Sequence, residues 1–162
     1  MRYKIVPEPR SREALLAARD ALPLVPGSVE DCCTRIRDRT DVPSRDRARE
    51  LLTFLQALGL AKEASHGFHR VRGDVTDEQL REAFLANVYG AREIVDALAD
   101  SDGPLDAADA LAAIRDGVPR WERSQYADWE AEWRERAANL LAWAETFGLA
   151  ASVDGGYVAT DP

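Results

Sequence analysis

Hydrophobic residues recur at spacings of three and four between Arg47 and Phe68, which predicts a helix with one apolar face. The apolar stripe consists of Ala48, Leu51, Leu52, Leu55 and Leu58. Gly59 follows the stripe, at the position where a glycine commonly ends a helix in the left-handed conformation. A short apolar segment, a polar tip with Gly67 and a second short segment come next. The pattern therefore predicts a helix that leads into a small β-hairpin.

The same pattern returns 89 residues later, from Arg136 to Tyr157. Eight of the 22 positions are identical when the two stretches are aligned without a gap. The identical pairs are Arg47/Arg136, Ala48/Ala137, Leu51/Leu140, Leu52/Leu141, Gly59/Gly148, Leu60/Leu149, Ala61/Ala150 and Gly67/Gly156. Residues 154–156, Asp-Gly-Gly, are a strong turn signal in the second copy. An internal repeat of this kind predicts two copies of one structural unit.

The segments between and before these stretches predict further helices. Residues 11–22 and 28–40 each begin with a serine that can cap a helix, and Ser44 can cap the helix of the first copy. Another helix is expected over residues 106–116. Residues 117–127 have no counterpart in the first copy, and we expect them to lengthen the start of the next helix.

A long helix is expected to join the two copies. It begins at the capping box formed by Thr76 and Gln79. Its apolar side consists of Leu80, Phe84, Val88, Ala91, Val95 and Leu98. Gly90 lies within this helix and would allow a kink, and residues 102–104 end it. We expect the helix to supply the first helix of the second copy.

Helices followed by a hairpin in each copy resemble the winged helix-turn-helix superfamily. The resemblance rests on the Leu-Leu pair, the aromatic residue and the Gly-Leu of the third helix, and on the glycine–aromatic pair of the hairpin. It implies a mainly α (α+β) fold of tandem winged-helix lobes, residues 1–73 and 74–162, with hairpins near residues 60–72 and 148–160. The alternative is two unrelated helix–hairpin units. Winged helices bind DNA, RNA or other proteins, so the fold leaves the partner open.

The amino-acid composition affects what the negative net charge of the chain implies about nucleic-acid binding. The chain of 162 residues has a formal net charge of −8, and only Lys4 and Lys62 among its 21 basic residues are lysines. This composition resembles that of halophilic archaeal proteins, whose acidic surfaces serve solubility, so acidity counts less than usual against nucleic-acid binding. The sequence shows no signal-peptide pattern and no apolar run of about 18 residues. We therefore expect a cytoplasmic protein with no membrane contact.

The strongest candidate site is a group of arginines within residues 35–49. Six arginines and three aspartates give this stretch a local charge of +3. In DNA-binding winged helices this region enters the major groove, where arginine contacts guanine or phosphate. The candidate DNA-binding residues are Arg35, Arg37, Arg39, Ser44, Arg45, Arg49, Thr53, Arg70 and Arg72, of which the last two flank the wing. The alternative is an ordinary solvated face, in which Asp46 neutralises neighbouring arginines.

The second lobe has a different composition. Between residues 120 and 136 four arginines accompany five acidic residues, a poor balance for binding phosphate. All four tryptophans lie in this lobe. Trp121, Trp129 and Trp133 are candidate protein-interface residues and would support a homodimer through this lobe, because tryptophan is enriched at interfaces. The alternative, favoured by the helical spacing of Trp129, Trp133 and Ala137, is that they belong to the core.

Catalysis and cofactor binding have little support. No GxSxG, HExxH, P-loop or Rossmann fingerprint is present. Cys32, Cys33, His66 and His69 are four potential metal ligands, but their spacings match no familiar zinc motif. The sequence therefore predicts a non-enzymatic protein without metal or cofactor. It is either a DNA-binding or transcription-associated protein that uses the third helix and wing of the first lobe, or a winged-helix adaptor that assembles protein partners.

Overall fold

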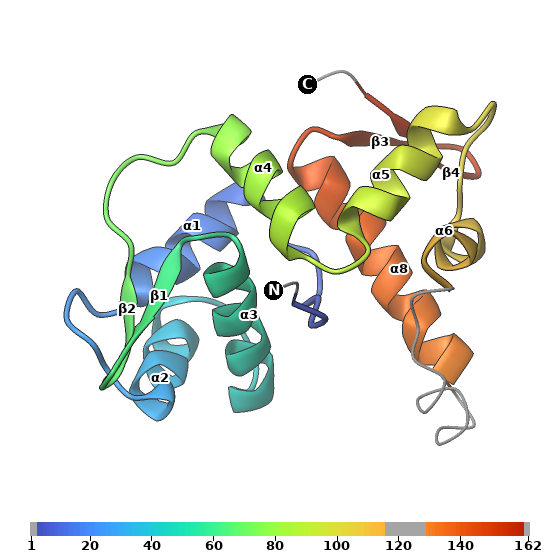
Figure 1. The fold of residues 1–162 in the computed structure, drawn as a ribbon. Helices are drawn as coiled ribbons and strands as arrows, with labels where there is room; N and C mark the ends of the chain where they lie inside the picture. The colour runs from blue at the N-terminus through green and yellow to red at the C-terminus, as the bar shows by residue number, and fades with distance from the viewer. Residues whose placement is uncertain (1–2, 116–128, 161–162) are drawn as a thin grey trace. The chain divides into compact units, whose positions relative to one another are not determined.

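The computed structural model describes residues 3–115 and 129–160 (Figure 1). Its backbone contacts divide the chain into two compact units, residues 1–89 (unit 1) and 90–162 (unit 2). The sequence predicts a boundary between the two lobes after residue 73, whereas the backbone contacts group residues 74–89 with unit 1. None of the described helices is both long and apolar enough to cross a lipid bilayer.

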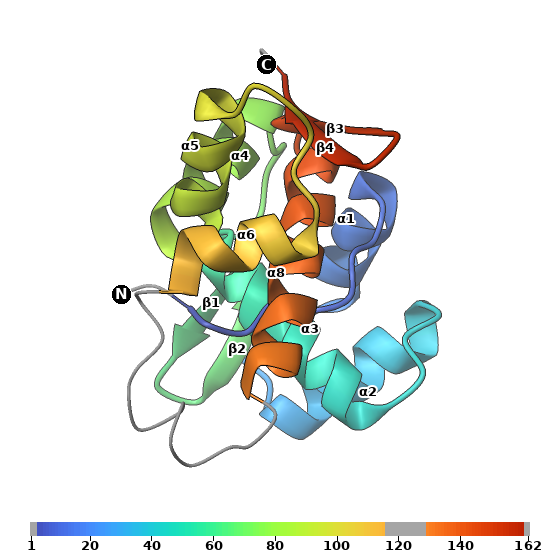
Figure 2. The same ribbon diagram turned by 90° about the vertical axis from the view of Figure 1, so that its right-hand side faces the viewer.

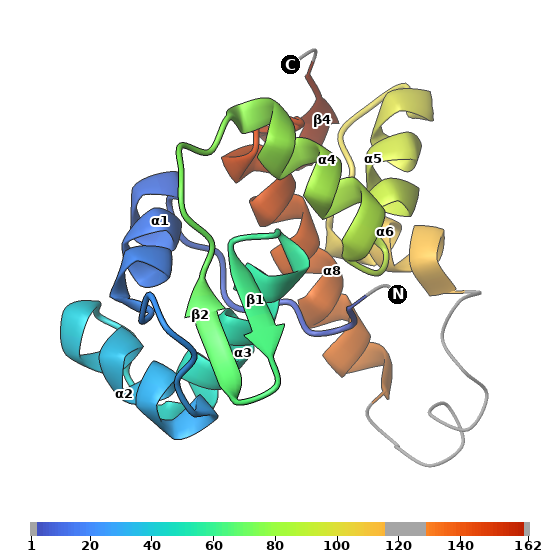
Figure 3. The same cartoon turned by 60° about the vertical axis from the view of Figure 1, so that its left-hand side comes forward.

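Unit 1 begins with three helices and a hairpin. They are α1 (Arg12–Ala21), α2 (Val29–Arg39), α3 (Arg45–Ala57), β1 (Ala61–Ala64) and β2 (Gly67–Arg70). The three helices pack against one another, and β1 lies against α3 and pairs antiparallel with β2 (Figure 3). Each helix begins after a serine, Ser11, Ser28 or Ser44, whose hydroxyl accepts a hydrogen bond from a backbone N–H three residues later. The predicted caps are therefore confirmed.

The β1–β2 hairpin, the wing, is tied to the helices by the linker between α1 and α2. Gly27 in this linker donates a backbone hydrogen bond to Phe68 O (2.9 Å) and accepts one from Phe68 N (2.8 Å). Gly67 makes this approach possible, because a Cβ at that position would lie 2.0 Å from Gly27 O. Its φ of +139° is also one that other residues rarely adopt. The sequence predicted the hairpin but not this third pairing segment.

Unit 2 repeats the arrangement. Its elements are α5 (Ala91–Asp100), α6 (Ala107–Ile114), α8 (Trp129–Thr146), β3 (Ala150–Val153) and β4 (Gly156–Ala159). α6 packs against α5 and α8, and Figure 2 shows α6 lying across α8. Leu105 exchanges two backbone hydrogen bonds with Tyr157, both 2.9 Å long. A Cβ on Gly156 would lie 2.2 Å from Leu105 O, so this glycine has the role that Gly67 has in unit 1.

The third helix of each unit ends in the same way. Gly59 and Gly148 have φ values of +78° and +79°. The next backbone N–H in each case, that of Leu60 or Leu149, donates a 2.8 Å hydrogen bond to the carbonyl five residues earlier. This hydrogen bond and the left-handed glycine are the features of a Schellman cap. The 89-residue sequence repeat is therefore a repeat of helix end, turn and hairpin.

The two copies differ in length between the linker and the hairpin that pairs with it. Gly27 and Leu105, the linker residues that pair with the hairpins, are 78 residues apart, whereas Phe68 and Tyr157 are 89 apart. The difference of 11 residues equals the length of residues 117–127, which the sequence comparison had left without a counterpart. The expectation that residues 117–127 lengthen the start of the next helix concerns residues that lie outside the described part of the chain.

The single long helix predicted after Thr76 is two helices. α4 (Asp77–Asn87) belongs to unit 1 and α5 to unit 2, and Val88–Gly90 separates them. Tyr3 pairs with the chain at this break: its N–H donates to Asn87 O (2.6 Å), and its carbonyl accepts from Tyr89 N (2.8 Å). Gly90 adds a left-handed residue with φ +88°. The prediction of one helix was wrong because hydrophobic periodicity cannot reveal backbone hydrogen bonds to a distant segment.

Candidate nucleic-acid interface

An ion pair joins the start of α3 to the first turn of α2. Arg45 Nε lies 2.7 Å from Glu30 Oε1 and 2.9 Å from Oε2, and Arg45 Nη2 also donates to Oε1. The hydrogen bond from Arg45 lowers the pKa of Glu30. Contact of one guanidinium with both carboxylate oxygens fixes its orientation as well as its position. Arg45 is therefore held in one direction on the surface of unit 1.

Two further arginines lie near this pair. Burial raises the pKa of the Cys33 thiol in α2, the charge of Arg45 lowers it, and Glu30 raises it again, with smaller lowering effects from Arg49 and Arg37. Arg49 follows Arg45 by about one turn on α3, and Arg37 lies on α2, which packs against α3. Arg37 and Arg49 are exposed and form no ion pair with any described residue. We call Arg37, Arg45 and Arg49 the α2–α3 basic surface.

Other residues predicted for the interface have local structural contacts. Arg35 pairs with a carboxylate one turn earlier on α2, at 3.0 Å. Ser44 caps α3, and Thr53 Oγ1 donates a 3.2 Å hydrogen bond to Arg49 O. Arg39 is exposed at the end of α2. These contacts account for Arg35, Ser44 and Thr53 without a ligand.

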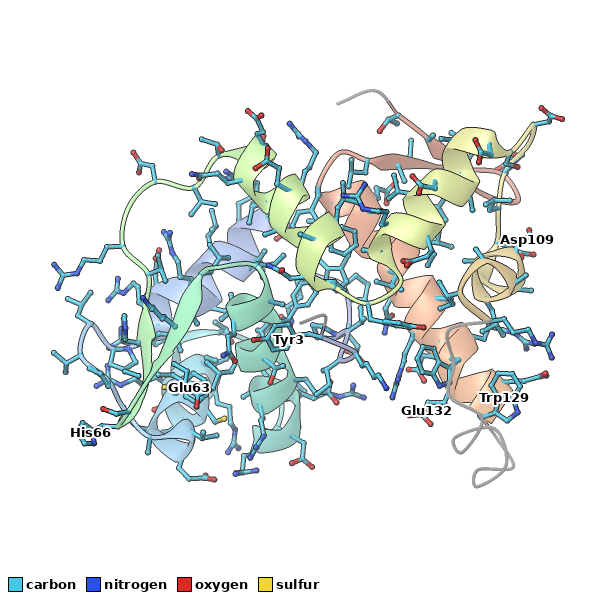
Figure 4. All side chains as sticks on the ribbon, viewed as in Figure 1. Tyr3, Glu63, His66, Asp109, Trp129 and Glu132 are labelled. Atoms are coloured by element: carbon cyan, nitrogen blue, oxygen red, sulfur yellow. The ribbon has the colours of Figure 1, made fainter. Side chains whose placement is uncertain are left out.

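Arg70 and Arg72 lie at the base of the wing. The tip of the hairpin holds His66, as Figure 4 shows, and Arg70 is the last residue of β2. Both arginines line a cavity of about 300 Å³ together with Arg19 of α1. Arg19 was not among the predicted site residues, since no pattern along the chain connects it with the wing. The structure thus separates the predicted arginines into the α2–α3 basic surface and this cavity.

The corresponding face of α8 lacks most of these polar side chains. At an offset of 89 residues, Arg49 corresponds to Ala138 and Thr53 to Ala142. Arg45 corresponds to Arg134, which is exposed. Since unit 2 forms the same helices and hairpin with alanine at two of these positions, the fold itself does not require the polar residues of unit 1.

The described residues form helices and a wing in each of the two units, and this arrangement agrees with the comparison with known proteins. The family model of the halobacterial double winged helix domain matches residues 1–162. The chain belongs to this family. The match confirms the tandem winged-helix fold and the halophilic archaeal character predicted from composition. No curated protein and no solved structure matches the chain.

The tryptophans of this double winged helix chain are only partly available to a partner. Trp133 is 3% exposed, and the Arg136 guanidinium lies 4.6 Å from its ring centre. Trp129, at the start of α8, is half-buried with Arg115 5.5 Å from its ring centre (Figure 4). Trp121 lies outside the described residues. For Trp133 the structure supports the core interpretation that the helical spacing favoured.

The cysteines and histidines of unit 1 do not form a ligand set. Cys32 and Cys33 are buried free thiols of α2, and burial raises the pKa of Cys32 to about 11. Cys32 Sγ lies 3.7 Å from Phe68 O, beneath the wing. Within the described part of the chain, no group of three or more His, Cys, Asp or Glu residues could hold a metal ion. Cys32, Cys33, His66 and His69 are therefore not gathered around a common point.

Proposed function

We propose that this double winged helix protein binds double-stranded DNA through the α2–α3 basic surface of unit 1 and has no catalytic activity. The observation that carries the proposal is the placement of Arg37, Arg45 and Arg49 on the packed helices α2 and α3 in a chain of net charge −8. Guanidinium groups contact phosphates and can bind guanine through two hydrogen bonds. A cluster of arginine side chains in a chain of negative net charge favours the binding of an anion at that place.

Glu30 is compatible with this role of Arg45. The side chains of Arg45 and Glu30 are 42% and 65% exposed, so solvent and salt weaken their attraction. A phosphate or a guanine edge can therefore replace Glu30, or Glu30 can remain and orient Arg45 toward a base. Both arrangements use an arginine whose direction is set before DNA binds.

The proposal is tested by removing the two unpaired arginines. Arg37→Ala combined with Arg49→Ala should abolish most binding to genomic duplexes at low salt, measured by fluorescence anisotropy with the full chain. Each phosphate contact that is lost should reduce the slope of log K against log salt by about one. Arg134→Ala is the matched control, because Arg134 occupies the position of Arg45 in unit 2 and is also exposed. It should leave the affinity almost unchanged.

The result that would overturn the proposal is the absence of binding to both random and genomic duplexes, at low and at high KCl, by protein that circular dichroism shows to be folded. Equal loss of affinity in the Arg134 variant would also contradict it, since unit 2 would then share the binding surface.

A second candidate function is a winged-helix adaptor that assembles protein partners. It is favoured by the extent of charge compensation: Arg35, Arg45 and Arg47 all form ion pairs with acidic side chains. The predicted homodimer through the second lobe is compatible with both candidates, since palindromic DNA sites are commonly bound by twofold dimers. A pull-down at native salt, with and without nuclease, distinguishes the two functions. Partners retained after nuclease treatment, from a protein that binds no duplex, would favour the adaptor.

A further inference from the structure

The cavity at the base of the wing lies wholly within unit 1. It has a volume of about 300 Å³, and its lining includes Arg19, Asp20, Leu24, Arg70, Arg72 and Gly73. These residues come from the end of α1, the α1–α2 linker, the end of β2 and the segment that follows it. The pairing of β2 with the linker brings them together, since Arg70 N donates a 2.9 Å hydrogen bond to Pro23 O.

Three arginines and one aspartate line this cavity. Arg19 is fixed by two hydrogen bonds: Nε donates to Asp20 Oδ1 (3.0 Å) and Nη1 to Gly73 O (2.9 Å). Its side chain is only 13% exposed. Arg72 is exposed, and Asp74 lies near it in an adjoining hollow. With Asp20 as the only acid in the lining, the cavity carries an excess of positive charge.

Arg70 lines the cavity and lacks one hydrogen-bond partner in the described structure. Its Nε is buried and has no hydrogen-bond acceptor among the described residues. A buried N–H of a charged group without an acceptor is unfavourable, and such a group calls for a bound water or ion. The buried Nε itself does not open onto the cavity, but Arg70 and Arg72 both line it, so an oxyanion placed there could accept from the terminal nitrogens of their guanidinium groups.

The rim of the cavity is apolar on one side. Leu24 is 48% exposed, which is unusual for a large hydrophobic side chain in the described part of this chain. Pockets for small molecules combine apolar walls with a few converging polar groups, and their volumes start at about 300 Å³. The cavity therefore suits a small molecule with both an anionic and an apolar part.

Arg19 has structural hydrogen bonds of its own, but the secondary structure of the unit does not require an arginine at position 19 or 70. Arg70 pairs with Ala61 across the wing of unit 1, and the corresponding pair in unit 2 is Ala159 with Ala150. At the end of α1 the carbonyl of Arg19 accepts a hydrogen bond from the backbone N–H of Leu22. At the end of α5 the carbonyl of Leu98 accepts the equivalent hydrogen bond from Ser101. Unit 2 thus forms the same elements with alanine and leucine at these two positions.

We propose that the cavity formed by Arg19, Arg70, Arg72 and Leu24 binds a small organic oxyanion, a carboxylate or phosphate ester whose apolar part lies against Leu24. The site lies at the base of the wing, is distinct from the α2–α3 basic surface, and does not depend on DNA binding. Guanidinium groups favour carboxylate and phosphate because both oxyanions accept two parallel hydrogen bonds.

The test is isothermal titration of the full chain with phenyl phosphate, benzoate and inorganic phosphate in KCl. Phenyl phosphate or benzoate should bind saturably, and more tightly than inorganic phosphate. Arg70→Gln and Arg72→Gln should each weaken binding by about tenfold or more, as expected for a lost hydrogen bond between charged groups. Leu24→Ser should weaken binding of the two aromatic probes and leave inorganic phosphate unaffected.

Arg39→Gln is the matched control, because Arg39 is exposed, lies outside the cavity and forms no ion pair with any described residue. Its binding should equal that of the unaltered chain. Arg72→Gln is a second test variant, needed if the half-buried Arg70 variant does not fold, since Arg72 is exposed and its replacement should leave the fold intact.

A short DNA duplex is also added as a competitor for the probe, using protein that carries Arg37→Ala and Arg49→Ala. Displacement of the probe would identify the oxyanion as a backbone phosphate and overturn the small-molecule assignment, and no displacement would support a free small molecule.

Two further results would overturn the proposal. One is the absence of saturable binding of all three probes by folded protein at millimolar concentrations. The other is an equal loss of affinity in the Arg39→Gln control, which would show that the probes respond to general charge. A failure of the protein to bind DNA would leave both of these criteria unchanged, since the titrations contain nucleic acid only in the competition experiment.

Discussion

Replacing Gly67 by alanine should destabilise unit 1 far more than the loss of a surface glycine normally does. The Cβ that this substitution adds would lie 2.0 Å from Gly27 O and 2.6 Å from Gly27 C. These are backbone atoms, so no side-chain rotation can remove the overlap. The linker must move away from β2, and the two hydrogen bonds between Gly27 and Phe68 are lost with it.

The magnitude follows from two separate effects. Holding a non-glycine residue at φ +139° costs about 1–3 kcal/mol. Losing two backbone hydrogen bonds costs about 0.5–1.5 kcal/mol each. The sum, about 2–6 kcal/mol, is a large part of the stability of about 5–15 kcal/mol that is usual for a small domain. With about 4–8 °C of melting temperature per kcal/mol for a domain of this size, the shift should exceed about 8 °C.

Thermal unfolding at constant KCl measures the effect, with two signals followed together. Circular dichroism reports the helices of both units. Tryptophan fluorescence reports unit 2 alone, because all four tryptophans lie between residues 121 and 143. Gly67→Ala should lower the transition seen by circular dichroism. Gly156→Ala, whose Cβ would lie 2.2 Å from Leu105 O, should lower the fluorescence transition by a similar amount.

Two glycines provide matched controls. Gly73 has φ +105° but open space around its Cβ position, so Gly73→Ala isolates the conformational cost of about 1–3 kcal/mol. Gly103 has open space and no positive φ, so Gly103→Ala should be neutral or stabilise the chain by up to about 1 kcal/mol. The reasoning is refuted if Gly67→Ala is no more destabilising than Gly73→Ala, because the close approach to Gly27 would then have no energetic consequence.

Thiol labelling at pH 8 should proceed at the rate at which unit 1 opens, because Cys32 and Cys33 are buried and burial raises the pKa of Cys32 to about 11. Labelling as fast as in the unfolded chain would contradict that burial. Asp106 accepts the backbone N–H of Asp109 at the start of α6, and this hydrogen bond lowers its pKa. Its stabilisation should be present above the unfolded pKa of about 3.9 and be lost as the pH falls through the lower folded pKa. Asp106→Asn, which keeps an acceptor but cannot titrate, should therefore flatten the acid side of the unit 2 stability profile. Light scattering should show a homodimer if the second lobe is an interface, and a monomer mass at every KCl concentration would exclude this prediction.

Much of each winged helix could be predicted because its signals are local. Ser11, Ser28 and Ser44 cap their helices as expected, and Thr76 forms the expected capping box with Gln79. These predictions succeed because a cap depends on residues three positions apart.

The errors and omissions concern contacts between distant segments. Tyr3 pairs with the chain beside Val88, and this pairing divides the predicted long helix. Gly27 adds a third pairing segment to the wing, although no alternating pattern marks the linker as a strand. The cavity at the base of the wing was missed for the same reason, since Arg19 and Arg70 are brought together only by the fold.

Salt determines which property of the α2–α3 basic surface can matter most for DNA binding. At molar salt the gain from releasing counterions is small, so affinity must come mainly from contacts with bases and from DNA shape. Contacts with bases need side chains in defined directions, and the two carboxylate oxygens of Glu30 orient Arg45 through hydrogen bonds, although salt weakens the ionic part of this exposed pair. Arg37 and Arg49, which have no ion pair among the described residues, are better suited to phosphates. The discrimination between genomic and random duplexes should consequently depend on Arg45 at high salt, whereas the total affinity at low salt should depend on Arg37 and Arg49.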